Sequence, residues 1–198
     1  VGELRRLVMR VPQARRSQVE AQMRNLPLCE TTTSWLAPLS TTRRDSHETQ
    51  ELFKGIAGLH WLAADCSDAV KTEVAPITTG DIESWLTSQS GLNPDLPREP
   101  QLSRSPKVLD WVLERAHEWR DSNRFKTVFA ESSIWPSGGN LRTLSSLYVP
   151  GNFQDPLGLA TLLDGTVVGK WKRELVDILG ARVLNFDVYL KDLVPRRF

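Results

Sequence analysis

Apolar residues recur every three or four positions between about residues 46 and 74, a spacing typical of an amphipathic helix. The recurring side chains are Leu52, Phe53, Ile56, Leu59, Leu62, Ala63, Cys66, Ala69 and Val70. Asp45 or Ser46 can cap the start of this helix, because a short polar side chain accepts a hydrogen bond from a free backbone N–H. Pro76 ends it. The pattern therefore predicts one long helix over 46–74.

Shorter runs with the same spacing predict four further helices. They cover residues 1–10, 12–25, 81–90 and 106–122. In the last of these, Ser105 is the expected cap and Pro106 the first helical residue, where a missing N–H does no harm. The segment 28–45 is rich in Thr and Ser and predicts an ordered loop pinned by Trp35 and Leu36.

After Asn123 the pattern changes to shorter and partly alternating runs. The expected elements are a turn at 137–140, a strand over 141–149, short helices over 156–163 and 171–179, and a strand over 183–190. Gly180 is a natural stop for the second short helix. The sequence thus predicts a mainly α fold, with an N-terminal helical subdomain followed by a small mixed α/β C-terminal part.

Four prolines, Pro94, Pro97, Pro100 and Pro106, lie close together in the middle of the chain. Proline is disfavoured inside helices, so this stretch is expected to be extended. The predicted organisation is a helical subdomain over 1–92, a Pro-rich linker over 93–106, and a helix plus a small α/β subdomain over 107–198.

The composition is that of an ordinary folded protein, with 198 residues, 40% of them hydrophobic. Basic and acidic residues number 25 and 24, giving a net charge of +1. Nucleic acid and anionic membranes favour basic surfaces, so neither is an expected partner. Cys29 and Cys66 give neither a disulfide framework nor a zinc spacing, and free thiols suit a cytoplasmic location.

The segment Gly165–Trp171 (GTVVGKW) resembles a phosphate-binding loop only superficially. That loop needs four residues between its glycines and a Ser or Thr after the lysine, whose hydroxyl holds magnesium. Here three residues separate the glycines and Trp171 follows Lys170. No nucleotide site is therefore expected at this segment.

A catalytic role for His60, Cys66 or His117 is the least favoured interpretation. On one helix, His60 and Cys66 would point in different directions and could not form a nucleophile–base pair. The pairs His117 with Glu114 and His47 with Glu48 lack the spacing of a metal site. We therefore expect no catalytic, cofactor-binding or metal-binding residues, no cofactor, and no enzymatic activity in this chain.

The seven tryptophans could be stacking platforms for bases or for Pro-rich peptides. Most of them sit at helical core spacing, so core anchors are the preferred interpretation, for Trp35, Trp111 and Trp171 in particular.

Several short segments, taken in order, resemble the region of cytoplasmic dynein heavy chains that follows the last AAA+ module. Leu26-Pro27 and Thr32 to Leu36 are similar to the family's Leu-Pro and Thr-Pro-x-Trp-Leu-Gly-Leu. Glu51 to Phe53 opens a predicted helix, as the family's Leu-Phe segment does, and Val108 to Val112 resembles its Val-Ile-x-Trp-Val.

The resemblance continues to about residue 190. Leu147 to Pro150, followed by Phe153 and Leu159 to Thr161, is similar to the family's Leu-Phe-Val-Pro-Glu-Ala-Tyr-Ile-Thr-Ala-Thr, and Lys170 to Leu175 resembles Ser-Trp-Ser-Leu-Glu-Glu-Leu. Ser145-Ser146 stands where the family has Gly-Gly. Many dyneins continue into a β-barrel, so we expect a truncated or short form.

The resemblance implies a non-catalytic domain that packs on the AAA+ ring of the same heavy chain and modulates motor output in the cytoplasm, associated with the cytoskeleton. ATP hydrolysis and microtubule binding would lie elsewhere in that heavy chain. Arg5, Arg6, Arg10, Arg15 and Arg16 would be a solvated helix face, a ring-contact surface or a phosphate-binding surface. Other protein subunits are possible partners, and the alternative is a free-standing helical interaction or assembly subunit.

Overall fold

The computed structural model describes residues 6, 8–33, 36–54, 56, 58–88 and 98–196. The chain falls into two compact units, Val1–Thr78 (unit 1) and Thr79–Phe198 (unit 2). The described residues form a mixed α/β structure that is mainly helical, as predicted, and its sheets are two-stranded. Among these residues, no helix is both long and apolar enough to cross a membrane.

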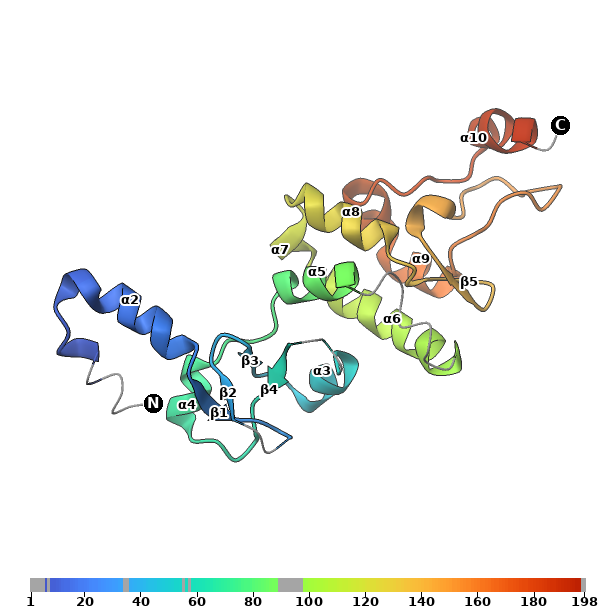
Figure 1. Ribbon diagram of the computed structural model, residues 1–198. Helices are drawn as coiled ribbons and strands as arrows, with labels where there is room; N and C mark the ends of the chain where they lie inside the picture. Colours follow the sequence, from blue (N-terminus) through green and yellow to red (C-terminus); the bar gives the residue numbers. More distant parts are fainter. Residues whose placement is uncertain are drawn as a thin grey trace. The chain divides into compact units, whose positions relative to one another are not determined.

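Unit 1 combines short helices with two small sheets (Figure 1). Its elements are α2 (Gln13–Arg24), β1 (Pro27–Glu30), β2 (Leu36–Pro38), β3 (Thr42–Arg43), α3 (His47–Leu52), β4 (His60–Trp61) and α4 (Asp68–Glu73). β1 pairs with β2 in antiparallel fashion, and β3 pairs with β4 in parallel. Helix α2 confirms the predicted helix over 12–25, whereas most of the predicted helix over 1–10 lies outside the described residues.

The predicted long helix over 46–74 is wrong. Ser46 does cap α3, since its hydroxyl oxygen accepts from the Thr49 N–H at 3.2 Å, but α3 ends at Leu52. Gly58 then adopts a left-handed φ of +75°, and the chain enters β4 before it forms α4. The apolar spacing reflects burial, which two short helices and a strand between them also provide.

The segment 28–45 forms strands rather than the predicted loop. β1 and β2 pair from Pro27 with Pro38 to Glu30 with Leu36. Leu36 is 63% exposed and does not pin the segment, and Trp35 lies outside the described residues. Backbone hydrogen bonds between β1 and β2 therefore hold this segment in place.

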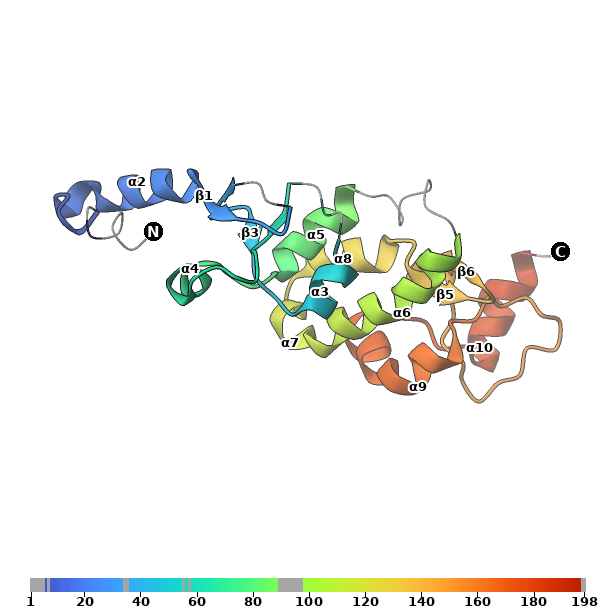
Figure 2. The ribbon, with the colours of Figure 1, turned by 90° about the horizontal axis from the view of Figure 1, so that it is seen from below.

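Unit 2 contains most of the helices (Figure 2). Its elements are α5 (Thr79–Ser88), α6 (Arg98–Glu114), α7 (Ala116–Trp119), α8 (Asn123–Glu131), β5 (Trp135–Ser137), β6 (Asn140–Arg142), a 3₁₀ turn η1 (Leu144–Ser146), α9 (Gly165–Arg173), a π-helical turn η2 (Glu174–Ile178), α10 (Phe186–Val188), a second π-helical turn η3 (Tyr189–Leu193) and a 3₁₀ turn η4 (Val194–Arg196). α5 confirms the predicted helix over 81–90, and α6 with α7 confirms the one over 106–122.

Helix α6 begins at Arg98, so the prediction that residues 93–106 are extended is wrong for 98–106; residues 93–97 lie outside the described part of the chain. Pro106 lies inside this helix and Ser105 does not cap it. The Ser105 hydroxyl instead donates to the Ile134 carbonyl oxygen, just before β5. Proline has no N–H to donate to a carbonyl oxygen of the preceding turn. The helix persists here because Val108 and several residues after it are buried in the core.

An aromatic cluster forms much of the core of unit 2. The ring centroids of Trp119 and Phe125 lie 5.2 Å apart, and those of Phe129 and Trp135 lie 4.8 Å apart. Each indole donates to a backbone carbonyl, Trp119 to Val112 at 2.9 Å and Trp135 to Phe129 at 3.0 Å. Buried indoles need such a partner, so core anchoring is confirmed for these two tryptophans. Trp85 and Trp111 are also buried.

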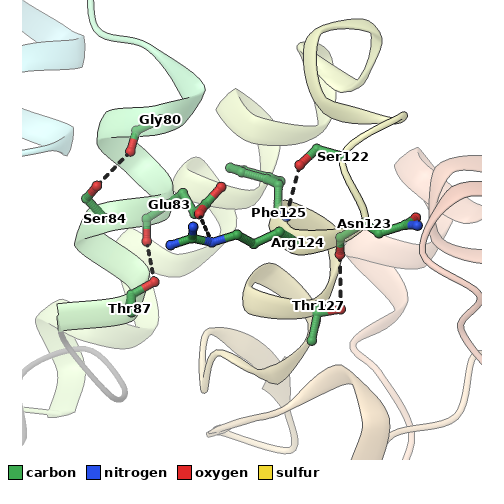
Figure 3. A network of polar contacts seen from close by, with 9 residues as sticks. All are labelled: Gly80, Glu83, Ser84, Thr87, Ser122, Asn123, Arg124, Phe125 and Thr127. Atoms are coloured by element: carbon green, nitrogen blue, oxygen red, sulfur yellow. Dashed lines mark hydrogen bonds and ion pairs between the residues drawn. The ribbon is translucent and has the colours of Figure 1, made fainter.

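An ion pair joins helices α5 and α8 (Figure 3). Arg124 Nε donates to Glu83 Oε1 at 2.6 Å, and the hydroxyl oxygen of Ser122 accepts from the Phe125 N–H at 3.2 Å to cap α8. Figure 3 shows Asn123 pointing away from this ion pair. The Phe125 side chain is buried, so the cap fixes the position of a core residue.

Two C-terminal predictions are wrong. Residues 156–163 form turns and a bridge rather than a helix, and 183–190 form α10 and the start of η3 rather than a strand. In the second segment, the Asn185 side chain accepts from the Val188 N–H at 2.9 Å, which starts a helix inside an alternating sequence.

The remaining C-terminal predictions are confirmed in part. Gly138 and Gly139 have positive φ in the turn between β5 and β6, but the strand expected over 141–149 is only three residues long. A helix is present at the second predicted site, but α9 starts at Gly165 and continues through η2. Gly180, with φ of +67°, follows it as predicted.

Candidate functional site

The three residues considered for catalysis do not form a site in the part of the chain that the structure describes. His60 lies in β4 and Cys66 in the turn before α4, so the helix expected to carry both is absent. The Cys66 thiol donates to the Glu30 carbonyl oxygen at 3.7 Å. His117 belongs to unit 2, and its side chain is 74% exposed beside Glu118. Within the described residues, no three His, Cys, Asp or Glu side chains gather as metal ligands.

The GTVVGKW segment is helix α9, packed against α6. Asp164 caps it by accepting from the Thr166 N–H at 2.9 Å. The Lys170 ammonium lies 3.0 Å from an Asp110 oxygen and 3.6 Å from a Glu114 oxygen. The hydrogen bond that Lys170 donates to Asp110, with the charges of both carboxylates, raises the pKa of Lys170. This lysine is therefore engaged in helix packing rather than presented to a phosphate.

A hollow of about 650 Å³ lies between one face of α8 and residues 178–182. Lys126 and Arg182 bring positive charge to it. The Arg182 guanidinium donates to the Ser145 carbonyl oxygen at 2.6 Å, and its Cζ lies 4.5 Å from the centroid of the Tyr148 ring. These contacts engage Arg182 in joining η1 to the segment after η2, so we assign it a structural role.

Unit 1 has a hollow of about 590 Å³ beside α3. His47 and Gln50 line it, and the Gln50 amide donates to the Asp45 carbonyl oxygen at 2.9 Å. Its other walls include Leu62, Ala63, Ala64 and Pro76. His47, considered from the sequence with Glu48 as a possible metal ligand, lines this hollow. No second histidine lines it among the described residues.

The C-terminal end of unit 2 has an apolar core of its own. Tyr148, Leu184, Tyr189 and Leu193 are buried together, and Phe153 packs against them. The Phe153 ring centroid lies 4.9 Å from that of Tyr189 and 5.8 Å from that of Phe186. These contacts attach the loop around residue 153 to the last helical segment.

Two large apolar side chains of this helical segment face outward. Phe186 is 59% exposed and Leu190 is 46% exposed, whereas Tyr189 and Leu193 are buried. Positions four apart share one face of a helix, so Phe186 and Leu190 form a ridge that Phe153 extends. We call Phe153, Phe186 and Leu190 the C-terminal apolar face. In the strand predicted over 183–190, alternation would place Phe186 and Leu190 on the same side as Leu184, which is buried, so that prediction gave no indication of an exposed ridge.

The loop that carries Phe153 is held by the Asp155 carboxylate. This carboxylate accepts from the N–H groups of Leu157 at 3.1 Å and Ala160 at 2.6 Å, and it also interacts with Tyr189. Burial opposes ionisation of Asp155, but the N–H donors outweigh it and lower the pKa of this carboxyl. Leu157, in the same loop, is a further exposed apolar side chain. The apolar face therefore rests on an ordered support rather than on a loose tail.

No family model, no curated protein and no solved structure matches this chain.

Proposed function

We propose that this chain is a non-catalytic protein-binding module and that its C-terminal apolar face packs on another protein surface. The observation that carries the proposal is the exposed ridge of Phe186 and Leu190 over an ordered aromatic support. Large apolar side chains grouped on one face are typical of protein contact surfaces. Aromatic and leucine side chains that become buried on binding supply much of the affinity of such contacts.

The proposed partner is the AAA+ ring of a dynein-like heavy chain, as the sequence resemblance implies. In this proposal the module biases which ring state is populated. Its cytoskeletal association would follow from the motor to which it belongs. The alternative is a separate protein subunit bound by the same face, in which case the chain is an assembly factor.

The first test is site-specific photo-cross-linking in the native full-length protein. A photoreactive amino acid replaces Leu190, and the matched control carries it at the exposed Lys172 of α9. We expect cross-linked peptides from an AAA+ ring of the same polypeptide at position 190 and not at position 172. Peptides from another protein would favour the assembly alternative, and equal labelling at both positions would overturn the binding role of this face.

The second test is the size of the endogenous polypeptide. Peptides of this sequence should be recovered by mass spectrometry from a denaturing gel band far above 22.4 kDa if the motor proposal is right. Recovery only near that mass would contradict it and would leave the assembly alternative.

A further inference from the structure

The only two cysteines of the chain belong to one small core cluster in unit 1. Cys29 is fully buried in β1 with Leu62 and Val74, and Cys66 packs against this cluster from the turn before α4. Unlike Cys29, Cys66 is only partly buried. The two cysteines are therefore brought to one cluster by the fold, although they are 37 positions apart in the sequence.

Backbone contacts hold the turn that carries Cys66 beside β1, which carries Cys29. The Cys66 thiol donates to the Glu30 carbonyl oxygen at 3.7 Å, and Glu30 directly follows Cys29 although it lies 36 positions from Cys66. The Ala63 N–H donates to that same carbonyl oxygen at 3.0 Å, which fixes the turn that carries Cys66. Thr31 and Leu62 form an antiparallel bridge beside it.

The position of Cys66 also affects the Cys29 thiol. Burial raises the pKa of the Cys29 thiol, a hydrogen bond with the Thr42 side chain opposes this, and the nearby Cys66 adds to the increase. A buried thiol with a raised pKa is a poor first nucleophile, whereas a partly exposed thiol can meet a small oxidant. The arrangement therefore separates an accessible thiol from a sheltered one.

We propose that Cys66 and Cys29 form an oxidation site, in which a peroxide converts the two thiols to an intramolecular disulfide. The Cys66 sulfur attacks one peroxide oxygen, the O–O bond breaks, and a sulfenic acid and one water form. The Cys29 sulfur then attacks the Cys66 sulfur, the S–O bond breaks, and the Cys29 proton leaves with the hydroxyl group as a second water. Two thiols and one hydrogen peroxide thus give one disulfide and two waters.

The bond would close a loop that contains β2, β3, α3 and β4. Linking β1 to the turn before α4 restricts the unfolded chain more than the folded one, because the two segments already lie together in the fold. Oxidation would therefore stabilise unit 1 without a large change in its structure. The proposal concerns unit 1 alone and does not depend on the protein-binding role proposed above.

The test uses the full chain, reduced and then treated with hydrogen peroxide. After quenching, the protein is unfolded, alkylated without reductant and analysed by intact mass and peptide mapping. We expect a monomer that has lost two hydrogen atoms, takes up no alkyl group and yields one cross-linked peptide joining Cys29 to Cys66. We also expect its thermal unfolding midpoint to rise by on the order of 10 °C, and a phosphine reductant should reverse both changes.

Two variants make the result specific. In Cys66→Ser, which alters a partly exposed position, Cys29 should remain fully alkylatable after peroxide treatment, and the unfolding midpoint should not change. In Cys29→Ala, Cys66 should gain oxygen or form dimers between chains. The proposal is overturned if the wild-type chain gains oxygen or dimerises while Cys29 stays alkylatable, or if the cross-link forms only when peroxide is added to unfolded protein.

Discussion

The Trp171 indole N–H donates to an Asp110 carboxylate oxygen at 2.6 Å, and the two residues are 61 positions apart in the sequence. This bond joins α9 to α6, and the second Asp110 oxygen lies 3.0 Å from the Lys170 ammonium. One carboxylate thus receives two donors from adjacent residues of the same helix. Asp110 is therefore the residue on which the packing of α9 against α6 depends most directly.

Replacing Asp110 tests this dependence. Asp110→Ala removes the acceptor for the indole, and we expect the free energy of unfolding to fall by about 1–2 kcal/mol, because the indole loses a charged partner. Asp110→Asn keeps an oxygen for Trp171 and should be less harmful. Urea denaturation measures both. The control is Asp177→Asn, which removes only an exposed contact with Arg173; a control as destabilised as Asp110→Ala would contradict the assignment.

Ser105→Ala should destabilise unit 2 although it removes a single oxygen atom. The Ser105 side chain is fully buried, and its hydroxyl donates to the Ile134 carbonyl oxygen. A buried carbonyl left without its donor costs about 1–3 kcal/mol. Ser84→Ala is the matched control, because that hydroxyl is exposed and bonds only to Gly80 in its own helix. Equal unfolding midpoints for the two variants would argue against a bond between α6 and the residue before β5.

Gly151→Ala should disrupt the support of the C-terminal apolar face. A methyl group at this position would overlap the Leu184 carbonyl oxygen, which belongs to the backbone and cannot swing aside. Two neighbouring hydrogen bonds would have to break. In these, the Leu184 N–H donates to the Val149 carbonyl oxygen at 2.9 Å, and the Val149 N–H donates to the Arg182 carbonyl oxygen at 2.8 Å. Thermal unfolding followed by near-ultraviolet circular dichroism measures this effect. We expect the variant to lose its signal at a lower temperature than the wild type.

Gly169→Ala is the control for that experiment. It lies in α9, where an added methyl group meets nothing within 4 Å. Alanine favours helix by up to about 1 kcal/mol over glycine, so this variant should be as stable as wild type or more stable. A destabilised Gly169→Ala together with a tolerated Gly151→Ala would reverse our interpretation of both sites.

The Asp155 carboxylate should contribute stability that depends on pH. Its pKa in the folded chain is lowered, so the contribution is complete above the ordinary aspartate pKa and is lost as pH falls through the lowered value. Asp155→Asn places an amide N–H₂ against a backbone N–H, and we expect a loss of about 1 kcal/mol at neutral pH. In strongly acidic solution the two proteins should converge. A difference that is unchanged across this pH range would exclude the charged form as the cause.

The apolar spacing predicts several of the shorter helices correctly. The helix over 81–90 and that over 12–25 are examples, and the turn with Gly138 and Gly139 was found because glycine tolerates positive φ. Of the three tryptophans named as core anchors, Trp111 is buried as predicted, Trp171 is only partly buried, and Trp35 lies outside the described residues. The features predicted correctly depend on local sequence, which is why sequence analysis found them.

The errors arose where a contact distant in sequence decides the structure. Pairing of β3 with β4 interrupts the helix predicted over 46–74. The side chain of Asn185 starts a helix in a segment whose alternation equally fits a strand. The proximity of Cys29 and Cys66 depends on the whole fold of unit 1, so no spacing rule could find it. The apolar face was missed for the same reason, because its exposure depends on which side of α10 the core occupies.

The π-helical turn after α9 offers a place where the length of the chain can vary. In η2 the Leu179 N–H donates to the Glu174 carbonyl oxygen at 3.1 Å, a bond that spans one residue more than in an α-helix. Removing the exposed Asp177 would convert this turn to a regular α-helical one and leave the residues after it in place. The same deletion within α9 would rotate every later side chain by about 100°. Homologues that differ by one residue in this region should therefore differ at η2 and keep the helix before it intact.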